Sequence, residues 1–183
     1  MFVGKKVKLR GLKMEDVEPA YQYMCDPEVL LNLSPGIPYP MTLEREKQWF
    51  ESQIAMQDTY NFSIEDLETG LYIGGCGINK IDWKNRVATV GIYIGDKDFR
   101  GRGYGTEAMG LLINFIFSQM NINRIQLSVF SFNERAIRSY KKNGFIEEGR
   151  LKQSIFRNGR YYDEIIMGIL REDYNNFSKD CTG

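Results

Sequence analysis

Hydrophobic and polar residues alternate along several short stretches of the chain, with a period of two that predicts β-strands. The opening stretch KKVKLRGL alternates in this way, and a run beginning at Tyr60 predicts two strands around a turn at residues 68–70. Asn158-Gly159 separates two further alternating stretches and is typical of a tight hairpin turn. The predicted strands lie within residues 5–12, 60–83, 86–95, 124–130 and 145–170.

Other stretches place apolar residues at the spacing of an amphipathic α-helix. The predicted helices lie within residues 14–25, 42–56, 106–120 and 133–144. The third is apolar around most of its circumference, as expected of a helix packed closely against a sheet. Because it joins two predicted strands, we expect a parallel crossover within a mixed α/β fold whose sheet is largely antiparallel.

Domain organisation follows from length and from the distribution of turn-forming residues. The 183 residues predict one domain, over residues 1–175, followed by a flexible tail at 176–183. The stretch LNLSPGIPYPMT, residues 31–42, holds three of the five prolines and predicts an irregular loop. Loops of this kind often shape binding sites.

Composition excludes several classes of function. Lys plus Arg equals Asp plus Glu, 24 each, so no global charge attracts nucleic acid or an anionic membrane. The chain has no histidine, which excludes Ser-His and Cys-His nucleophile pairs and histidine metal sites. Three widely separated cysteines fit neither a disulfide framework nor a clustered metal site. With no signal peptide or membrane span in the pattern, we expect a soluble cytoplasmic protein without a metal.

One loop carries the strongest chemical signal. The stretch FRGRGYGTEA, residues 99–108, sets two arginines among three glycines, between a strand ending near Ile94 and a helix beginning near Thr106. Backbone N–H groups at a helix N-terminus favour an anion, and glycines allow close approach of a phosphate. Charge from two arginines suits a pyrophosphate better than an isolated monophosphate. The alternative is a simple turn with solvated arginines.

Two common phosphate motifs do not fit this loop. The Walker A motif needs Lys followed by Ser or Thr after its last glycine, whereas Thr106 and Glu107 follow Gly105. The dinucleotide fingerprint needs G-x-G-x-x-G, whereas the glycines here are spaced G-x-G-x-G and follow a meander of strands.

The loop instead resembles a family signature. Arg100, Gly103 and Gly105 match the pattern Q/R-x-x-G-x-G/A of the GNAT acetyltransferase superfamily, whose members hold the pyrophosphate of acetyl-CoA with it. A second family element is similar to Asn133, Ala136, Tyr140 and the NGF at residues 143–145. The wider stretches resemble the branch of ribosomal-protein N-terminal and polyamine N-acetyltransferases, from the opening predicted strand to about Tyr174.

The resemblance implies a fold, a cofactor and its ligands. It implies the GNAT fold, with a mostly antiparallel sheet of about seven strands and helices on both faces, and acetyl-CoA as the acetyl donor. In the family, a backbone N–H of the strand through residue 93 stabilises the oxyanion, and this strand separates from its neighbour to admit the pantetheine. The implied cofactor-binding residues are Ile92, Tyr93, Ile94, Arg100, Gly101, Arg102, Gly103, Tyr104, Gly105, Thr106, Asn133, Ala136 and Lys142.

Catalytic roles follow from the chemistry of acetyl transfer. Tyr140 stands where many members place the tyrosine that protonates the leaving thiolate, although a packed helix aromatic is the alternative. Many relatives carry a glutamate base where this chain has Thr89, which cannot take up a proton at neutral pH. Water relayed to Asp82 or Glu65 could replace it, or both could be solvated surface charges. Stabilisation by the helix dipole explains a glutamate at position 107, in the first turn of the predicted helix, without a catalytic role.

The acceptor is expected to be a primary amine, either a protein N-terminus or a small molecule. Tyr39 and Thr89 are candidates to line its site, and Trp49 and Phe50 could line it or only pack. A polyamine is the alternative acceptor, although SPGIPYP lacks the carboxylate it would call for. A CoA-binding sensor without transfer activity is the alternative from another class. The sequence is compatible with a monomer or a homodimer.

Overall fold

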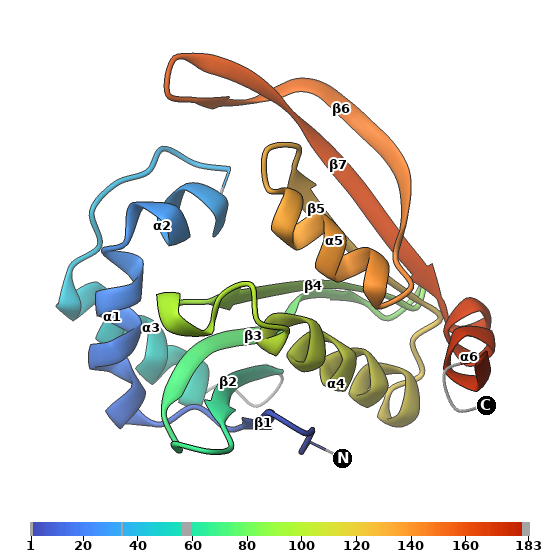
Figure 1. Cartoon of the computed structure of the whole chain (residues 1–183), viewed down its shortest axis with the longest axis horizontal. Helices are drawn as coiled ribbons and strands as arrows, with labels where there is room; N and C mark the ends of the chain where they lie inside the picture. The colour runs from blue at the N-terminus through green and yellow to red at the C-terminus, as the bar shows by residue number, and fades with distance from the viewer. Residues whose placement is uncertain (1, 34, 56–59, 181–183) are drawn as a thin grey trace. The chain divides into compact units, whose positions relative to one another are not determined.

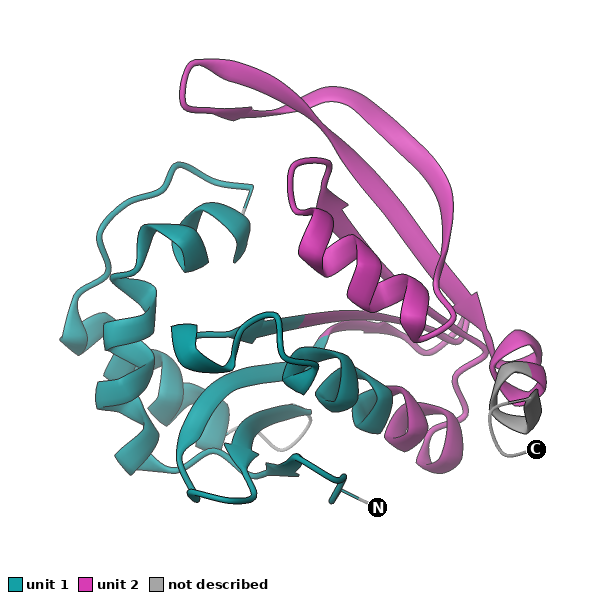
Figure 2. Cartoon of the chain, in the orientation of Figure 1, with its two compact units in different colours: residues 1–78, 92–112 teal, residues 79–91, 113–183 magenta. Residues whose placement is uncertain are grey.

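The structure is a computed structural model that describes residues 2–33, 35–55 and 60–180, with side chains to residue 176. It divides into two compact units (Figure 2), Met1–Ile78 with Ile92–Leu112 and Asn79–Gly91 with Ile113–Gly183. We call them unit 1 and unit 2. Three elements pass from one unit to the other along the chain, namely β3 (Tyr72–Asp82), β4 (Val87–Ile94) and α4 (Tyr104–Gln119).

Helices and strands follow one another as Figure 1 shows. The remaining elements are β1 (Val7–Arg10), η1 (Met14–Asp16), α1 (Val17–Met24), α2 (Pro27–Leu33), α3 (Leu43–Ala55), β2 (Asn61–Asp66), η2 (Lys97–Phe99), β5 (Arg124–Phe130), α5 (Glu134–Lys142), β6 (Ile146–Arg157), β7 (Arg160–Leu170) and α6 (Arg171–Asp180). No helix in the described part of the chain is long and apolar enough to cross a membrane.

The strands form one seven-stranded sheet in the order β1-β2-β3-β4-β5-β7-β6. Antiparallel pairing joins β1 to β2, β2 to β3, β5 to β7 and β6 to β7. β4 and β5 pair in parallel, with Val87–Thr89 opposite Arg124–Gln126. The order β4, α4, β5 is therefore the predicted crossover, and the predicted mixed fold with its largely antiparallel sheet is confirmed.

Unit 1 packs α1 and α3 around an apolar cluster. Val17 and Ala20 on α1, Phe50 on α3 and Tyr72 on β3 are buried together. Burial of each large apolar side chain contributes roughly 2 kcal/mol. This cluster fixes the face of α3 that points inward.

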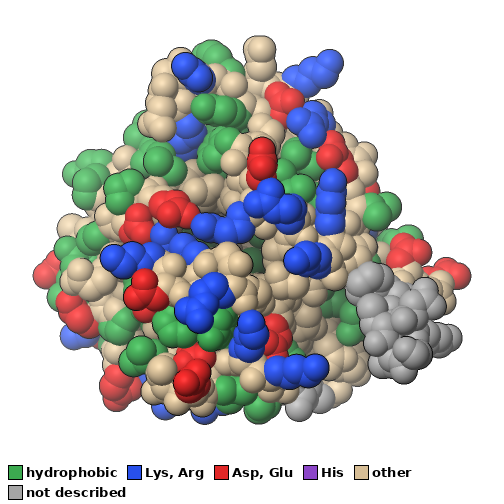
Figure 3. Space-filling view, in the orientation of Figure 1, with side chains coloured by type: hydrophobic (Ala, Val, Ile, Leu, Met, Phe, Trp, Pro, Cys, Tyr) green, Lys and Arg blue, Asp and Glu red, His purple; other side chains and the backbone are tan. Residues whose placement is uncertain are grey.

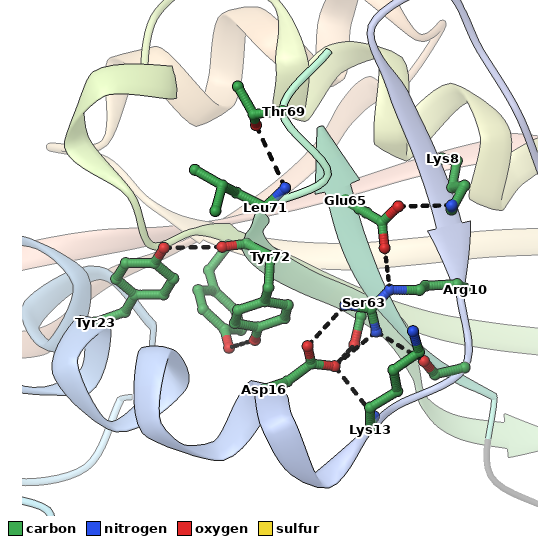
Figure 4. A network of polar contacts seen from close by, with 12 residues as sticks. Lys8, Arg10, Lys13, Asp16, Tyr23, Ser63, Glu65, Thr69, Leu71 and Tyr72 are labelled. Carbon is green, nitrogen blue, oxygen red and sulfur yellow. Dashed lines mark hydrogen bonds and ion pairs between the residues drawn. The ribbon is translucent and has the colours of Figure 1, made fainter. Parts of the chain in front are cut away.

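A polar network crosses from η1 to the sheet in the same unit (Figure 4). Asp16, only 3% exposed, accepts two hydrogen bonds of 2.7 Å from the guanidinium of Arg10 and a third from Ser63. Arg10 also pairs with Glu65, which binds Lys8. Although burial opposes ionisation, the hydrogen bond from Arg10 and others lower the pKa of Asp16. Every carboxylate in this network is thus matched by a cation.

In unit 2, β6 and β7 form the predicted hairpin. Asn158 and Gly159 have φ of +50° and +77°, the left-handed geometry of a tight two-residue turn. Side chains on β5 and β7 supply the core of this unit, including Ile125, Leu127 and Ile165.

Three boundaries differ from the prediction. α2 begins at Pro27, within a stretch where the proline predicted only a break, because proline fits the first turn of a helix and Asp26 accepts a hydrogen bond from the Glu28 N–H at 2.9 Å. α4 begins at Tyr104 rather than Thr106. α6 includes residues 176–180, which the pattern placed in a tail, and residues 181–183 lie outside the described part.

Candidate active site

The glycine-rich loop of unit 1 runs from the end of β4 through η2 into the first turn of α4. Gly101 and Gly103 have φ of +72° and +92°, values that other residues adopt only with strain. The i−4 carbonyls that would pair with the first backbone N–H groups of α4 lie before the start of the helix. The loop therefore leads into the end of α4 where backbone N–H groups and the positive end of the helix dipole favour an anion.

The three glycines of the loop, Gly101, Gly103 and Gly105, have different structural roles. A Cβ on Gly101 would meet nothing within 4 Å, and one on Gly103 would lie 3.7 Å from Nζ of Lys6. Gly105 has no positive φ, and its Cβ would lie 3.3 Å from Cγ1 of Ile94. Gly101 and Gly103 thus permit the loop conformation, whereas Gly105 permits close packing of α4 on β4.

Arg100 serves the loop in a different way from the predicted phosphate contact. Its side chain is 6% exposed and pairs with Asp26 at 2.7 Å and Glu28 at 3.0 Å. It also donates to the carbonyl oxygens of Ile94 and Gly95. With its charge already matched by two carboxylates, Arg100 braces the loop against the start of α2.

Two other cations remain available to an anion at this loop. Arg102 is exposed and donates to the Asp98 carbonyl at 2.9 Å, with no carboxylate paired to it in the described part of the chain. Nζ of Lys6 donates to the Arg102 carbonyl at 2.8 Å and lies 5.3 Å from the centre of the Tyr104 ring. Sequence reasoning missed Lys6, because it lies far from the loop in the chain and no motif marks it.

Glu107 explains how Lys6 reaches this loop. From the first turn of α4 its carboxylate accepts hydrogen bonds from the backbone N–H groups of Lys5 and Lys6. The carboxylate thus anchors the N-terminal segment beside the loop, a role that adds to the helix-dipole explanation. Figure 3 shows Lys and Arg side chains interspersed with Asp and Glu, so attraction of an anion depends on such local groupings.

The end of β4 carries the predicted oxyanion strand, Ile92, Tyr93 and Ile94. Gly74 on β3 is needed opposite it, because a Cβ there would collide with the carbonyl oxygen of Tyr93. The hydroxyl groups of Tyr93 and Tyr72 lie 2.5 Å apart. Burial is the main cause that raises the pKa of both phenols, so both are protonated at neutral pH.

The second motif lies in unit 2. Asn133 caps α5 by accepting a hydrogen bond from the Ala136 N–H at 3.1 Å, and Lys142 is exposed in the last turn. Tyr140 is 7% exposed and packs edge-on against Phe145, with ring centres 5.9 Å apart. Burial raises the pKa of Tyr140 to about 12. The phenol therefore carries its proton at neutral pH, as a proton donor must.

The carboxylates named as possible bases are already engaged. Glu65 pairs with Lys8 and Arg10, so the interpretation of Glu65 as a solvated surface charge is wrong. Asp82 is bound by the backbone and side chain of Asn85 in an exposed turn. Hydrogen bonds lower the pKa of both carboxylates, against the opposing effect of burial, which makes them weak bases. Thr89 accepts a hydrogen bond from Gln126 at 3.3 Å.

The aromatic candidates for the acceptor site differ in exposure. Phe50 is fully buried in the α1–α3 cluster and only packs. Trp49 is 44% exposed and meets Phe50 edge-on, and Tyr39 is 72% exposed in the proline-rich loop. Tyr39 and Trp49 thus keep surface that an acceptor can contact.

The different roles of Arg100, which stabilises the loop, and of Lys6 and Arg102, which are available to an anion, lead to a prediction. Replacing Lys6 and Arg102 by Gln should weaken binding of a pyrophosphate-containing ligand about 10-fold and flatten its salt dependence, because two exposed charges are lost. Arg100→Gln should instead lower the free energy of unfolding by about 2 kcal/mol, since Asp26 and Glu28 lose their partner. Calorimetry over a salt series and chemical denaturation measure the two effects. An unchanged unfolding free energy in Arg100→Gln would argue against the brace.

Comparison with known proteins places these features in context. The family described as an acetyltransferase (GNAT) domain matches residues 6–146. An uncharacterized N-acetyltransferase, p20 of Bacillus licheniformis, is 31% identical over 93% of this chain and 96% of its own. The spermidine N(1)-acetyltransferase of Escherichia coli strain K12 is 28% identical over 92% of this chain and 88% of its own. A spermidine N-acetyltransferase from Vibrio cholerae, solved in complex with CoA and spermine, is similar in structure, with a TM-score of 0.84 and 25% identity over 94% of this chain and all of that one.

Proposed function

Because the chain belongs to the GNAT acetyltransferase family, we propose that it transfers the acetyl group of acetyl-CoA directly to a primary amine of a peptide or small molecule. It is an acetyl-CoA-dependent N-acetyltransferase by family, and the resemblance carried by its two motifs is confirmed. The observation that carries the proposal is the loop of unit 1, where two glycines with positive φ precede the N-terminus of α4. Beside them lie two cations that have no carboxylate partner among the residues that the structure describes.

The loop residues are proposed to hold the cofactor. N–H groups of residues 101–106 would bind the pyrophosphate of acetyl-CoA, with charge from Lys6 and Arg102. Asn133, Ala136 and Lys142 remain proposed contacts for the rest of the cofactor. Arg100 contributes by keeping the loop in its binding conformation.

The transfer itself needs two groups from the protein. The neutral amine nitrogen attacks the thioester carbonyl, and a backbone N–H at Ile92–Ile94 stabilises the oxyanion that forms. As the carbon–sulfur bond breaks, the hydroxyl of Tyr140 donates its proton to the CoA thiolate. The proton released by the amine returns to solvent, so CoA leaves as the thiol and the acceptor leaves as the amide.

The acceptor is proposed to be a primary amine that is cationic in solution. Relatives named for spermidine support a polyamine, and the V. cholerae protein was solved with spermine. The proline-rich loop has no carboxylate between residues 35 and 40, so its aromatic Tyr39 is the candidate contact there. Family membership favours an enzyme over a CoA-binding sensor.

A screen of acceptors tests this function. Thiol release from acetyl-CoA is measured with polyamines, peptide N-termini, aminoglycosides and amino acids at equal concentration. We expect amine-dependent release with at least one class, accompanied by a mass increase of that amine. Tight binding of CoA without release for any amine would instead support the sensor.

A further inference from the structure

One acidic side chain is buried in unit 1 without a partner. Glu46 on α3 is 5% exposed and lies one helical turn before Phe50, so both point to the inward face of that helix. Within the described residues, no hydrogen-bond donor or cation meets its carboxylate. Asp16, buried to the same degree, accepts hydrogen bonds from Arg10, Ser63 and Lys13.

An unpaired carboxylate costs folding free energy, and burial accordingly raises the pKa of Glu46. In the described part, every side-chain nitrogen or oxygen that is fully shielded from solvent has a hydrogen-bond partner. The carboxylate oxygens of Glu46, which have none, therefore keep some contact with solvent. Stabilisation by the helix dipole does not explain why Glu46 is buried, because Glu44 lies in the same first turn, is stabilised by the same dipole and is exposed.

Packing connects the inward face of α3 with the oxyanion strand inside unit 1. Phe50 packs with Tyr72, whose hydroxyl meets that of Tyr93 on β4. The charge of Glu46 also adds to burial in raising the pKa of Tyr72 and Tyr93. The inward face of α3, which carries Glu46 and Phe50, is thus linked through Tyr72 to the strand that contains Tyr93.

We propose that Glu46 binds the ammonium group of a cationic acceptor and takes up its proton before transfer. This rests on the proposed function and assigns the base that Thr89 cannot supply. In the step, one N–H bond of the ammonium breaks, the proton moves to a carboxylate oxygen of Glu46, and the nitrogen keeps the electron pair with which it attacks the thioester. After release of the amide, Glu46 returns the proton to solvent.

Glu46→Gln tests this role, with Glu44→Gln as the matched exposed control from the same turn. Calorimetric titration of spermidine into the CoA-saturated protein should show binding about 10-fold weaker in Glu46→Gln, because a charge-assisted contact is lost. kcat/KM should fall by more than this, while acetyl-CoA affinity stays unchanged. Glu44→Gln should match the wild type in all three measurements.

Thermal unfolding separates a binding role from a structural one. Removing an unpaired buried charge should leave Tm equal or higher in Glu46→Gln, whereas loss of a structural contact would lower it. Equal spermidine binding in both variants, or no spermidine binding by the wild type at millimolar concentration, would overturn the inference. Acetylation of uncharged acceptors alone would overturn it while leaving acetyl transfer intact.

Discussion

Gly103→Val is expected to weaken acetyl-CoA binding about 100-fold. A β-branched side chain at φ of +92° is strained, and strain at such positions costs about 1–3 kcal/mol. A Cβ at this position would also lie 3.7 Å from Nζ of Lys6, one of the two cations proposed to hold the pyrophosphate. Together these effects amount to about 3 kcal/mol, or two orders of magnitude in Kd. Isothermal calorimetry with acetyl-CoA measures the loss.

Gly70→Val is the matched control for strain. Gly70 has φ of +72° with open space around it, in the turn between β2 and β3. Its replacement should lower stability but leave acetyl-CoA affinity at the wild-type value. If folded Gly103→Val binds acetyl-CoA as tightly as Gly70→Val, the loop is only a turn.

Tyr140→Phe is expected to lower kcat and kcat/KM together by roughly 100-fold, the lower range for general acid catalysis. The variant keeps the ring that packs on Phe145 and removes only the proton donor. Acetyl-CoA affinity should therefore stay near the wild-type value. Tyr174→Phe, which alters a half-buried tyrosine on α6 whose ring lies tilted against that of Phe117 on α4, is the control and should retain full activity. Wild-type kcat in Tyr140→Phe would remove Tyr140 from the mechanism.

The pH profile gives a second readout for Tyr140. Because burial raises its pKa to about 12, the phenol keeps its proton through neutral and mildly alkaline conditions. kcat should thus show no decline from loss of this proton below about pH 10. A falling limb well below that pH in the wild type, absent from Tyr140→Phe, would contradict the raised pKa.

The glycine-rich loop was predictable because its chemistry is local. The glycines with positive φ and the helix that follows them are adjacent in the sequence, and the Asn158-Gly159 turn also depends only on neighbouring residues. Strand and helix types followed from periodicity. α2 was missed because Pro27 signals both a break and a helix start, and only the Asp26 cap distinguishes them.

Roles that depend on distant partners could not be predicted. Arg100 resembles a phosphate ligand in sequence, and its pairing with Asp26 and Glu28 becomes visible only when the chain brings those segments together. Lys6 meets Arg102 across a comparable separation. Glu46 stands in the charged run EREK, where only the apolar Phe50 one turn later hints at an inward face. Such residues share a face or a site through tertiary packing, which periodicity does not encode.

Direct transfer to an amine is tested most plainly by following a labelled acetyl group. Protein is mixed with carbon-13 acetyl-CoA and the best acceptor from the screen, and both acceptor and intact protein are examined by mass spectrometry during one turnover. The proposed mechanism predicts that the label appears on the amine nitrogen in equal amount to the CoA thiol released, with the protein mass unchanged. Label on the protein before the amine, or thiol release without a labelled amine, would contradict it.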